Sequence, residues 1–314
     1  MDRGVIGGFG RHVCKRQVAM MDQQRVTAIV TAYRRIDQTL VTLRQLSECQ
    51  PLPAEIIVHV DGNQTDCATA IRNAFPRVQI ITSQSNVGPG GGRNKLIYAA
   101  ANDIVASFDD DSYPIDSDYF ARLLEIFRQR PDADVVASQI TDRGNVVAAA
   151  NPAIGPAVNF GGGGVAYRRD QFLASGGYVP LTVAYGMEEV DLSIRYLESK
   201  RKIYFSPWLR VFHDNDLSDH ARGEVTSGSI ANLALLVYLR YPIRYWPYGV
   251  MQVLNRIVWL LRVGRFRGLI SGVLNIPRHI WRHRAQRACV SPTTLATFFR
   301  ERRHSSALVP IVAP

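Results

Sequence analysis

The stretch DIVASFDDD, residues 103–111, decides the fold of this chain. It is a short apolar run that ends in three consecutive carboxylates, the pattern of a buried strand that ends at a polar edge. Similar runs occur at 26–33 (VTAIVTAY), 55–60 (EIIVHV) and 78–83 (VQIITS), and stretches with helical spacing separate them. Strands that alternate with helices predict a doubly wound α/β fold with a mostly parallel sheet.

Further elements are expected around these strands. Helices are placed by apolar residues at spacings of three and four, and strands by short apolar runs. The expected helices are 38–47, 69–75, 93–101, 118–130, 170–175 and 188–199; further strands are 134–139, 202–205 and 210–213, and 160–167 is glycine-rich and extended. Ligands of doubly wound sheets bind at the carboxyl ends of the strands, so the residues that follow the strands are the first candidates for function.

The size and composition of the chain exclude several classes of protein. It has 314 residues, of which 46% are hydrophobic and 20% charged, so it can bury a sizeable core and is neither disordered nor collagenous. The four cysteines lie far apart and form no CxxC pair. This spacing fits reduced thiols and gives no support for a zinc site or a disulfide framework.

The basic charge belongs to one C-terminal segment. The formal net charge is +10, but residues 225–300 contain eleven arginines and no acidic residue, and the rest of the chain is near neutral. Stretches such as VMQVLNRIVWLLRV (250–263) indicate C-terminal amphipathic helices. Such helices suit an anionic membrane surface. The alternative is that they pack on the rest of the chain or on a partner chain.

No targeting or membrane-spanning segment is recognisable. The first twenty residues carry scattered charges and glycines without the apolar core of a signal peptide, so we expect a tail. No stretch of 18 uncharged apolar residues occurs. We therefore expect a cytoplasmic protein, peripheral at the inner face of the cell membrane.

Asp109, Asp110 and Asp111 are the sharpest chemical feature of the sequence. Consecutive carboxylates repel one another unless a cation or hydrogen-bond donors offset the charge. Alternate side chains of an extended chain share a face, so Asp109 and Asp111 can point at one divalent cation while Asp110 points elsewhere. Oxygen ligands suit Mg²⁺ or Mn²⁺, and His213 could complete the site. The alternative is a solvated acidic turn.

Two further features suit a nucleotide. Asp61 ends the strand 55–60, where a carboxylate can bind a ribose hydroxyl or a base N–H; the alternative is an Asx turn or a helix cap. NVGPGGGRN (86–94) is a glycine-rich loop that opens a helix, and its backbone N–H groups favour an anion together with Arg93. It matches neither the dinucleotide fingerprint nor the P-loop.

Glu188, Glu189 and Asp191 lie in the first turn of the expected helix 188–199. Glu188 and Asp191 share a face of this helix, and Glu189 points about 100° away. Carboxylates at a helix N-terminus are usually solvated and favoured by the helix dipole. The functional alternative is a general base that faces the ligand site.

Taken in order, these stretches resemble the inverting nucleotide-sugar glycosyltransferases of family 2, which have the GT-A fold. The family patterns are VDDGSTD, NxGxxxARN, DxD and EDxDL, with a glycine-rich acceptor region before the last. The matching stretches are VTAIVTAYRR (26–35), VDGNQTD (60–66), NVGPGGGRN (86–94), SFDDDSYP (107–114), GGGGVAYRRDQFLASGGY (161–178) and MEEVDLSIR (187–195). Any one of them is weak, but six in order are specific.

The resemblance implies a role for each motif. Asp109 and Asp111, with His213, would hold the divalent metal, and Glu189 would be the catalytic base, with Glu188 and Asp191 as alternatives. The residues that would contact the donor, a nucleoside-diphosphate sugar, are Ala32, Tyr33, Arg34, Asp61, Asn86, Gly88, Arg93, Asp109 and Asp110. The acceptor region would include Gly162, Gly163 and Gly164.

The implied reaction is transfer of a hexosyl or deoxyhexosyl group, with inversion, to a hydroxyl of a glycan or lipid-linked acceptor in polysaccharide biosynthesis. Two residues depart from the family pattern. Gly62 replaces the second aspartate of VDDGSTD, which affects contacts to the base. Glu189 replaces the catalytic aspartate, which lengthens the side chain by one methylene.

The resemblance and the composition together divide the chain. A tail at 1–24 precedes a GT-A catalytic domain at 25–227, and a basic helical segment follows at 228–314. Within the catalytic domain we expect a Rossmann-like nucleotide-sugar-binding half at 25–112 and an acceptor half at 113–227.

Three other classes compete with glycosyl transfer. A basic nucleic-acid-binding protein is disfavoured because the arginines alternate with long apolar stretches and no nucleic-acid module is recognisable, so no nucleic acid is expected as a partner. A nucleotide-dependent oxidoreductase lacks its fingerprint after the first strand and leaves the three aspartates unused. A nucleotidyltransferase of related topology would release pyrophosphate from a nucleoside triphosphate.

Overall fold

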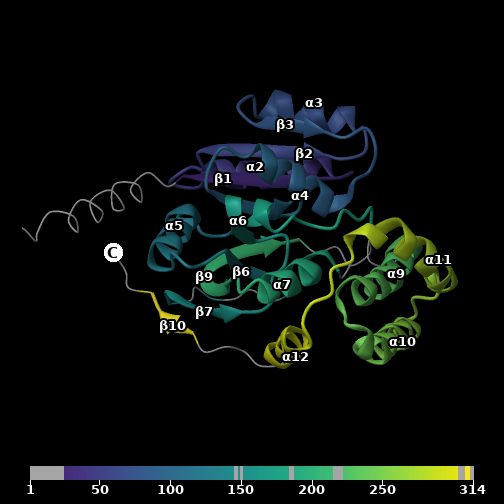
Figure 1. Ribbon diagram of the computed structural model, residues 1–314. Helices are drawn as coiled ribbons and strands as arrows, with labels where there is room; N and C mark the ends of the chain where they lie inside the picture. Colours follow the sequence, from purple (N-terminus) through teal and green to yellow (C-terminus); the bar gives the residue numbers. More distant parts are fainter. Residues whose placement is uncertain are drawn as a thin grey trace, which may run out of the picture.

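The computed structural model describes residues 25–144, 148, 151–183, 187–214, 222–302 and 308–311. The tail expected at 1–24 lies outside the described residues. Within them the chain forms one sheet with helices on both faces, and a group of helices follows at one end (Figure 1). The predicted α/β fold is confirmed.

The first half of the sheet is parallel, as the alternation of strands and helices predicts. Its strands lie in the spatial order β3-β2-β1-β4. Their bounds are β1 (Val26–Ala32), β2 (Glu55–Val60), β3 (Gln79–Thr82) and β4 (Ile104–Asp109). The register pairs Thr31 of β1 with Asp109 of β4, so the carboxyl ends of these two strands meet at one edge of the sheet.

Three helices connect these strands: α2 (Ile36–Glu48), α3 (Thr65–Ala74) and α4 (Gly88–Ala99). The sequence predicts that the last of them begins at residue 93, but α4 begins at Gly88, and the glycines form its first turns. Close packing explains the difference. A Cβ on Gly88 would clash with the carbonyl oxygen of Leu181, and one on Gly90 would come within 2.5 Å of the Glu188 carboxylate.

The second half of the sheet is mixed. Its strands are β6 (Val135–Thr141), β7 (Ala153–Ala157), β8 (Val165–Arg168) and β9 (Ile203–His213), with β5 (Ser112–Pro114) and β10 (Val309–Pro310) at the margins. β8 runs antiparallel to both β4 and β6, whereas β6 and β9 are parallel.

The two short strands predicted at 202–205 and 210–213 are wrong as separate elements. The structure has one strand of 11 residues, β9. Its pairing with β6 shifts register between Ser138 and Gln139, which pair with Ser206 and Arg210. Residues 207–209 bulge out of the ladder at this point, where Pro207 has no N–H to donate.

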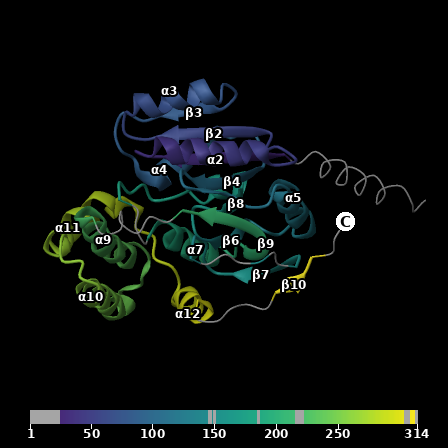
Figure 2. The ribbon, with the colours of Figure 1, turned by 180° about the vertical axis from the view of Figure 1, so that it is seen from behind.

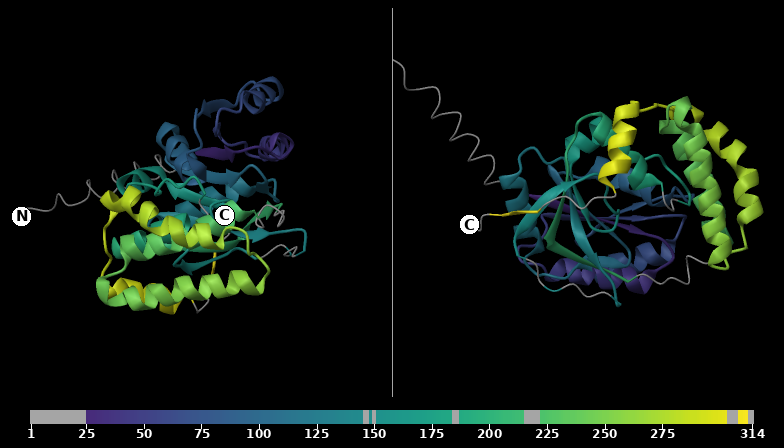
Figure 3. Two further views of the ribbon diagram at one scale, coloured as in Figure 1. Left: turned by 90° about the vertical axis from the view of Figure 1, so that its right-hand side faces the viewer. Right: turned by 90° about the horizontal axis from the view of Figure 1, so that it is seen from below.

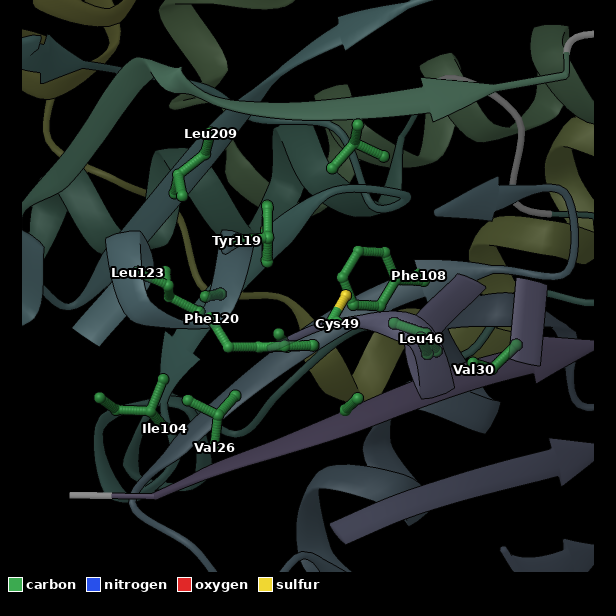
Figure 4. Packing of buried hydrophobic residues seen from close by; sticks show 14 of the residues in the cluster. Val26, Val30, Leu46, Cys49, Ile104, Phe108, Tyr119, Phe120, Leu123 and Leu209 are labelled. Carbon is green, nitrogen blue, oxygen red and sulfur yellow. The ribbon is translucent and has the colours of Figure 1, made fainter. Parts of the chain in front are cut away.

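Apolar clusters lie on both faces of the sheet. α2, α3 and α5 (Tyr119–Gln129) cover one face, where Leu46, Phe108 and Phe120 are buried together (Figure 4). α4, α6 (Arg169–Ala174) and α7 (Glu188–Glu198) cover the other face. Figure 1 shows the face with α4, α6 and α7 in front, and Figure 2 shows the face with α2 and α5. Burial on both faces explains why the strands are continuous apolar runs.

Within the described residues, a group of helices follows the sheet and packs beside one end of it (Figure 3). They are α9 (Gly223–Arg240), α10 (Trp246–Arg262), α11 (Leu269–His283) and α12 (Pro292–Glu301), with short 3-10 turns at Ile243–Tyr245 and Arg284–Gln286. α9 packs against both α10 and α11, and a third apolar cluster joins α9 and α12 to α7. The boundary that we place at 227/228 lies inside α9. No described helix is both long and apolar enough to cross a bilayer.

Candidate active site

Three side chains that can ligate a metal ion converge at the carboxyl end of β4. Asp109 ends β4, Asp111 follows two residues later, and His213 ends β9, which pairs with β5. One ligand atom from each residue lies within 4.8 Å of the others. Two carboxylate oxygens and an imidazole nitrogen are suitable ligands for Mn²⁺ or Mg²⁺, so the donor set fits a divalent cation.

The charges in this cluster stabilise one another. His213 Nε2 lies 3.2 Å from Asp111 Oδ1, and Arg35 also pairs with Asp111. Burial raises the pKa of Asp111, but His213 and Arg35 outweigh it and hold that pKa below its ordinary value. Burial lowers the pKa of His213, but the contact with Asp111 outweighs it and raises that pKa. His213 and Arg35 therefore offset part of the negative charge of the aspartates in this cluster.

Asp110 is not one of the three converging ligands; contrary to the expected extended chain, residues 110 and 111 form a turn between β4 and β5. Asp110 accepts a hydrogen bond from the backbone N–H of Tyr33 at 3.0 Å, and its Oδ1 lies 3.4 Å from Nη1 of Arg35. Burial raises the pKa of Asp110 to about 7. Arg35 is the residue of this cluster that the sequence analysis missed, although it stands in the polar stretch directly after β1.

Arg93 joins the metal-ligating cluster to α7. Its side chain is 2% exposed; Nη2 donates to Asp109, and Nη1 lies 3.8 Å from Oε1 of Glu189. Nε donates to the Ser107 hydroxyl at 3.1 Å. Burial lowers the pKa of Arg93, but Asp109 and the other groups around it outweigh burial and raise it, so the side chain stays charged. A fixed cation therefore stands between the two acidic groups.

Glu189 lies at the opposite side of Arg93 from Asp109. Its side chain is 24% exposed, and its Oε1 packs against the backbone of Gly162. Burial raises the pKa of Glu189 above its ordinary value, against the opposing effect of Arg93. A partly accessible carboxylate with a raised pKa is suited to accept a proton near neutral pH.

The other two candidate bases are buried in the packing. Glu188 is fully buried beside Gly90, and burial raises its pKa well above the ordinary value. Asp191 is also fully buried, and Arg240 and Arg195 bind its two oxygens at 2.5 and 2.8 Å. A carboxylate held in this way has no surface for a substrate. The geometry therefore favours Glu189 among the three.

Asp61 caps the beginning of α4. Its carboxylate accepts hydrogen bonds from the backbone N–H groups of Val87 and Gly88 at 2.9–3.1 Å. Asn86 supports the same turn, because its Oδ1 accepts from Gly88 at 2.8 Å. The helix cap, which was the structural alternative for Asp61, is therefore present, and its contact to a nucleoside stays a prediction.

The end of β1 faces this same edge. Ala32 is buried, whereas Tyr33 is partly exposed and Arg34 is exposed. The Arg34 guanidinium lies 4.9 Å from the centre of the Tyr33 ring, and the Arg34 N–H donates to Gln64 at 2.7 Å. The backbone N–H of Tyr33 donates to Asp110, so this segment adjoins the acidic residues, and its contact to a nucleotide stays a prediction.

The glycines of the predicted acceptor region form one wall of the site. A Cβ on Gly162 would come 2.5 Å from the guanidinium carbon of Arg93 and 2.6 Å from Oε1 of Glu189, and one on Gly163 would clash with Asp109. Glycine is required here because the backbone passes against the functional side chains. The structure thus brings the acidic cluster, Arg93, Glu189 and these glycines together.

A comparison with protein families agrees with this arrangement. Residues 27–173 match the model of Glycosyl transferase family 2. This stretch, somewhat under half of the chain, is similar to the family 2 glycosyltransferases. A curated relative, the succinoglycan biosynthesis protein ExoO of Rhizobium meliloti (strain 1021), is 32% identical over 117 residues, which is 37% of this chain and 31% of ExoO. The match thus spans about a third of the length of that relative.

Two solved structures share the fold of this chain. GalNAc-T7 with UDP, GalNAc and Mn²⁺ superposes with a TM-score of 0.55 at 12% identity, over 76% of this chain and 58% of that one. The mannosyltransferase PcManGT from Pyrobaculum calidifontis, in complex with GDP-Man and Mn²⁺, superposes with a TM-score of 0.53 at 14% identity, over 93% of this chain and 87% of that one. At these identities the likeness concerns the fold, which is that of the GT-A glycosyltransferases.

Proposed function

We propose that this chain is a metal-dependent, inverting glycosyltransferase that moves a sugar from a nucleoside-diphosphate sugar to a hydroxyl of a glycan or lipid-linked acceptor. The observation that carries the proposal is the juxtaposition of Asp109, Asp111 and His213 with Glu189, at the two ends of the buried Arg93. A cation site and a candidate base at one strand edge are the two parts that such a reaction needs.

Asp109, Asp111 and His213 would hold the divalent cation and thereby fix the diphosphate of the donor beside β4. When bound, Mn²⁺ or Mg²⁺ supplies a Lewis acid that neutralises charge on the departing nucleoside diphosphate. The structural neighbours were solved with Mn²⁺, which supports Mn²⁺ as the ion of choice for a first test. The transferred group is proposed to be a hexosyl or deoxyhexosyl unit.

Glu189 would accept the proton of the acceptor hydroxyl as that oxygen attacks C1 of the sugar from the side opposite the diphosphate. Two contacts prepare it for this role. Arg93 opposes the rise in pKa that burial causes at Glu189, and the backbone of Gly162 limits the positions that the side chain can take. The proton goes to Glu189 Oε, and the bond from C1 to the diphosphate breaks.

The test is the variant Glu189→Gln, which keeps the shape of the side chain and removes the base. A general base typically contributes 10²–10⁴-fold, about 3–5 kcal/mol of barrier. We expect turnover of a nucleoside-diphosphate sugar to fall by this factor, while binding of the nucleoside diphosphate with Mn²⁺ stays within about twofold of the unmodified chain. Near-normal turnover in Glu189→Gln would refute the assignment of the base.

We further propose that the helical segment holds the enzyme at the inner face of the cell membrane. The exposed apolar side chains of α11 recur at spacings of three, four and seven to eight residues, which places them on one helix face, and most of those on α10 also share a face. The set on α11 is Ile270, Val273, Leu274 and Trp281, and the set on one face of α10 is Val250, Met251, Leu254, Val258 and Leu261; the exposed Tyr248 and Trp259 lie on another side of α10. The eleven arginines of 225–300 complement an anionic surface.

Vesicle flotation tests the membrane proposal. The chain should float with phosphatidylcholine vesicles that contain phosphatidylglycerol, and the variant Ile270→Ser/Leu274→Ser should lose most of this binding. The matched control is Leu52→Ser/Tyr98→Ser, which removes two equally exposed apolar side chains from the sheet domain. Equal flotation of the two double variants would refute the role of α11.

A further inference from the structure

A cavity of about 700 Å³ lies between α9, α11 and the segment 181–183. Small residues of the two helices, among them Ser227 and Ser271, form its walls. The helices approach closely at one end, where a Cβ on Gly268 would clash with the carbonyl of Gly223. The volume is within the range of small-molecule sites, and the catalytic residues described above do not line it.

The segment 181–183 is a wall shared by this cavity and the active site. On the cavity side, Asn232 donates a hydrogen bond to the Val183 carbonyl at 2.7 Å. On the other side, the Leu181 carbonyl packs against Gly88 at the beginning of α4. The same α4 turn holds Glu188, the neighbour of the candidate base in sequence. The segment 181–183 therefore separates the cavity from the beginning of α4, the helix that carries Arg93.

Two arginines line the cavity from α11. Arg278 and Arg282 are four residues apart on one helix face and exposed, and within the described part of the chain no ion pair or hydrogen bond engages either guanidinium. Like charges at this spacing destabilise a helix, so helix stability does not explain them. Glu224 is the one acidic residue among the described lining. The pair is thus available to a ligand with negative charge.

The arginines stand at the border of the apolar face of α11. Counting about 100° per residue, Arg278 and Arg282 lie about 80–120° around the helix from Ile270, which marks the apolar face. His279 lies about 180° around, on the side that packs on α9, where its Nε2 is 2.9 Å from Asn232 Oδ1. The anion site is therefore between the packed face and the face that we assign to lipid.

We propose that this cavity is the acceptor site and that Arg278 and Arg282 bind a phosphate or diphosphate that joins the acceptor glycan to its lipid. The inference rests on the proposed function and deepens it, because it gives the acceptor a chemical class and a location. Guanidinium groups bind phosphate oxygens in bidentate fashion. The serine and asparagine side chains of the lining, among them Asn275, offer hydrogen bonds to sugar hydroxyls.

Inorganic pyrophosphate, without metal and at low salt, is the first probe. Isothermal titration should show that Arg278→Gln and Arg282→Gln each weaken pyrophosphate binding about tenfold, and the double variant about a hundredfold. The matched control is Arg262→Gln/Arg284→Gln, which removes the same charge from exposed arginines outside the cavity. Equal affinity in the two double variants would overturn the proposal.

A second experiment separates a lipid-linked phosphate from a free one. Phosphatidylcholine vesicles with and without a prenyl diphosphate are floated with the full chain. We expect the prenyl diphosphate to increase binding, and Arg278→Gln/Arg282→Gln to abolish the increase. Binding of pyrophosphate in solution without any increase on these vesicles would overturn the assignment to a lipid-linked acceptor.

Binding of a nucleoside diphosphate with Mn²⁺ is measured in the same variants, so that the two proposals fail separately. It should be unchanged in Arg278→Gln/Arg282→Gln, because neither arginine lies among the metal-ligating or donor residues. If the unmodified chain binds no nucleoside diphosphate with Mn²⁺, the proposed function fails. If it does, and the cavity variants bind pyrophosphate normally, only the acceptor site fails.

Discussion

Replacing Asp191 with asparagine should unfold the protein at a much lower temperature without a specific effect on the donor site. Asp191 is fully buried, and its carboxylate is the shared partner of Arg195 and Arg240. Arg240 comes from α9 and also donates to the backbone carbonyls of residues 286 and 288. The carboxylate therefore neutralises two arginines and ties the sheet domain to the helical segment.

The size of the effect follows from the burial of the partners. The side chains of Arg240 and Arg195 are 3% and 16% exposed, so without the carboxylate two positive charges remain in the interior. Breaking such a buried pair from one side costs about 3–5 kcal/mol. For a chain of this size each kcal/mol corresponds to about 2–4 °C, so we expect the melting temperature to fall by about 6–20 °C.

Differential scanning calorimetry of Asp191→Asn and Glu189→Gln, together with turnover of both, makes the comparison. Glu189→Gln should lose turnover and melt close to the unmodified chain, because its carboxylate is partly exposed and lies 3.8 Å from Arg93. Asp191→Asn should melt at a lower temperature than the unmodified chain. Assayed below that melting temperature, it should keep its turnover. If Asp191→Asn loses turnover by 10²-fold or more while its melting temperature is unchanged, the structural reading of Asp191 is refuted.

Two further predictions concern stability. Burial raises the pKa of Asp116, but Arg210 and Arg122 outweigh it and lower that pKa. The two arginines therefore stabilise the folded chain through the ionised Asp116. Their contribution is present above the unfolded pKa of about 3.9 and is lost as pH falls through the folded pKa. Urea unfolding should therefore give Asp116→Asn a lower free energy of unfolding than the unmodified chain at pH 7, and a smaller difference between the two at pH 3. A difference that is the same at both pH values would contradict this account. Gly90→Ala should cost about 1–3 kcal/mol, because its Cβ would meet the buried Glu188 carboxylate; urea unfolding that shows no loss would contradict the close packing.

The parallel half of the sheet could be predicted from sequence because its strands are buried on both faces. β1, β2 and β4 are mostly apolar runs that contain several β-branched residues, and each ends where the polar residues begin. β7 (AIGPA) could not, because glycine and proline at its centre remove the usual strand pattern. Judged from the local sequence, the glycines of α4 predict a loop. Close packing against Leu181 and Glu188, which are distant in the sequence, explains why they are helical.

The acidic cluster could be predicted for a similar local reason. Three carboxylates directly after a buried strand are enough to predict a shared site for Asp109 and Asp111, although the two converge through a turn at 110–111 and not through extended alternation. Contacts between residues that lie far apart in the sequence could not be predicted. Arg93 approaches Glu189 across 96 positions of sequence, and the partner of Asp191 on α9 lies 49 residues away, so sequence spacing gave no sign of either ion pair.

The central claim is that Asp109, Asp111 and His213 bind a divalent cation that holds a nucleoside diphosphate. A thermal-shift panel of UDP, dTDP, GDP and CDP, each with and without Mn²⁺, tests it on the unmodified chain and on Asp111→Asn. A ligand at a hundred times its dissociation constant adds about 2.7 kcal/mol, which is several degrees for this chain. The account predicts stabilisation by at least one nucleoside diphosphate that requires Mn²⁺ and is lost in Asp111→Asn. Stabilisation that ignores Mn²⁺ or survives in Asp111→Asn, or the absence of any stabilisation, would contradict it.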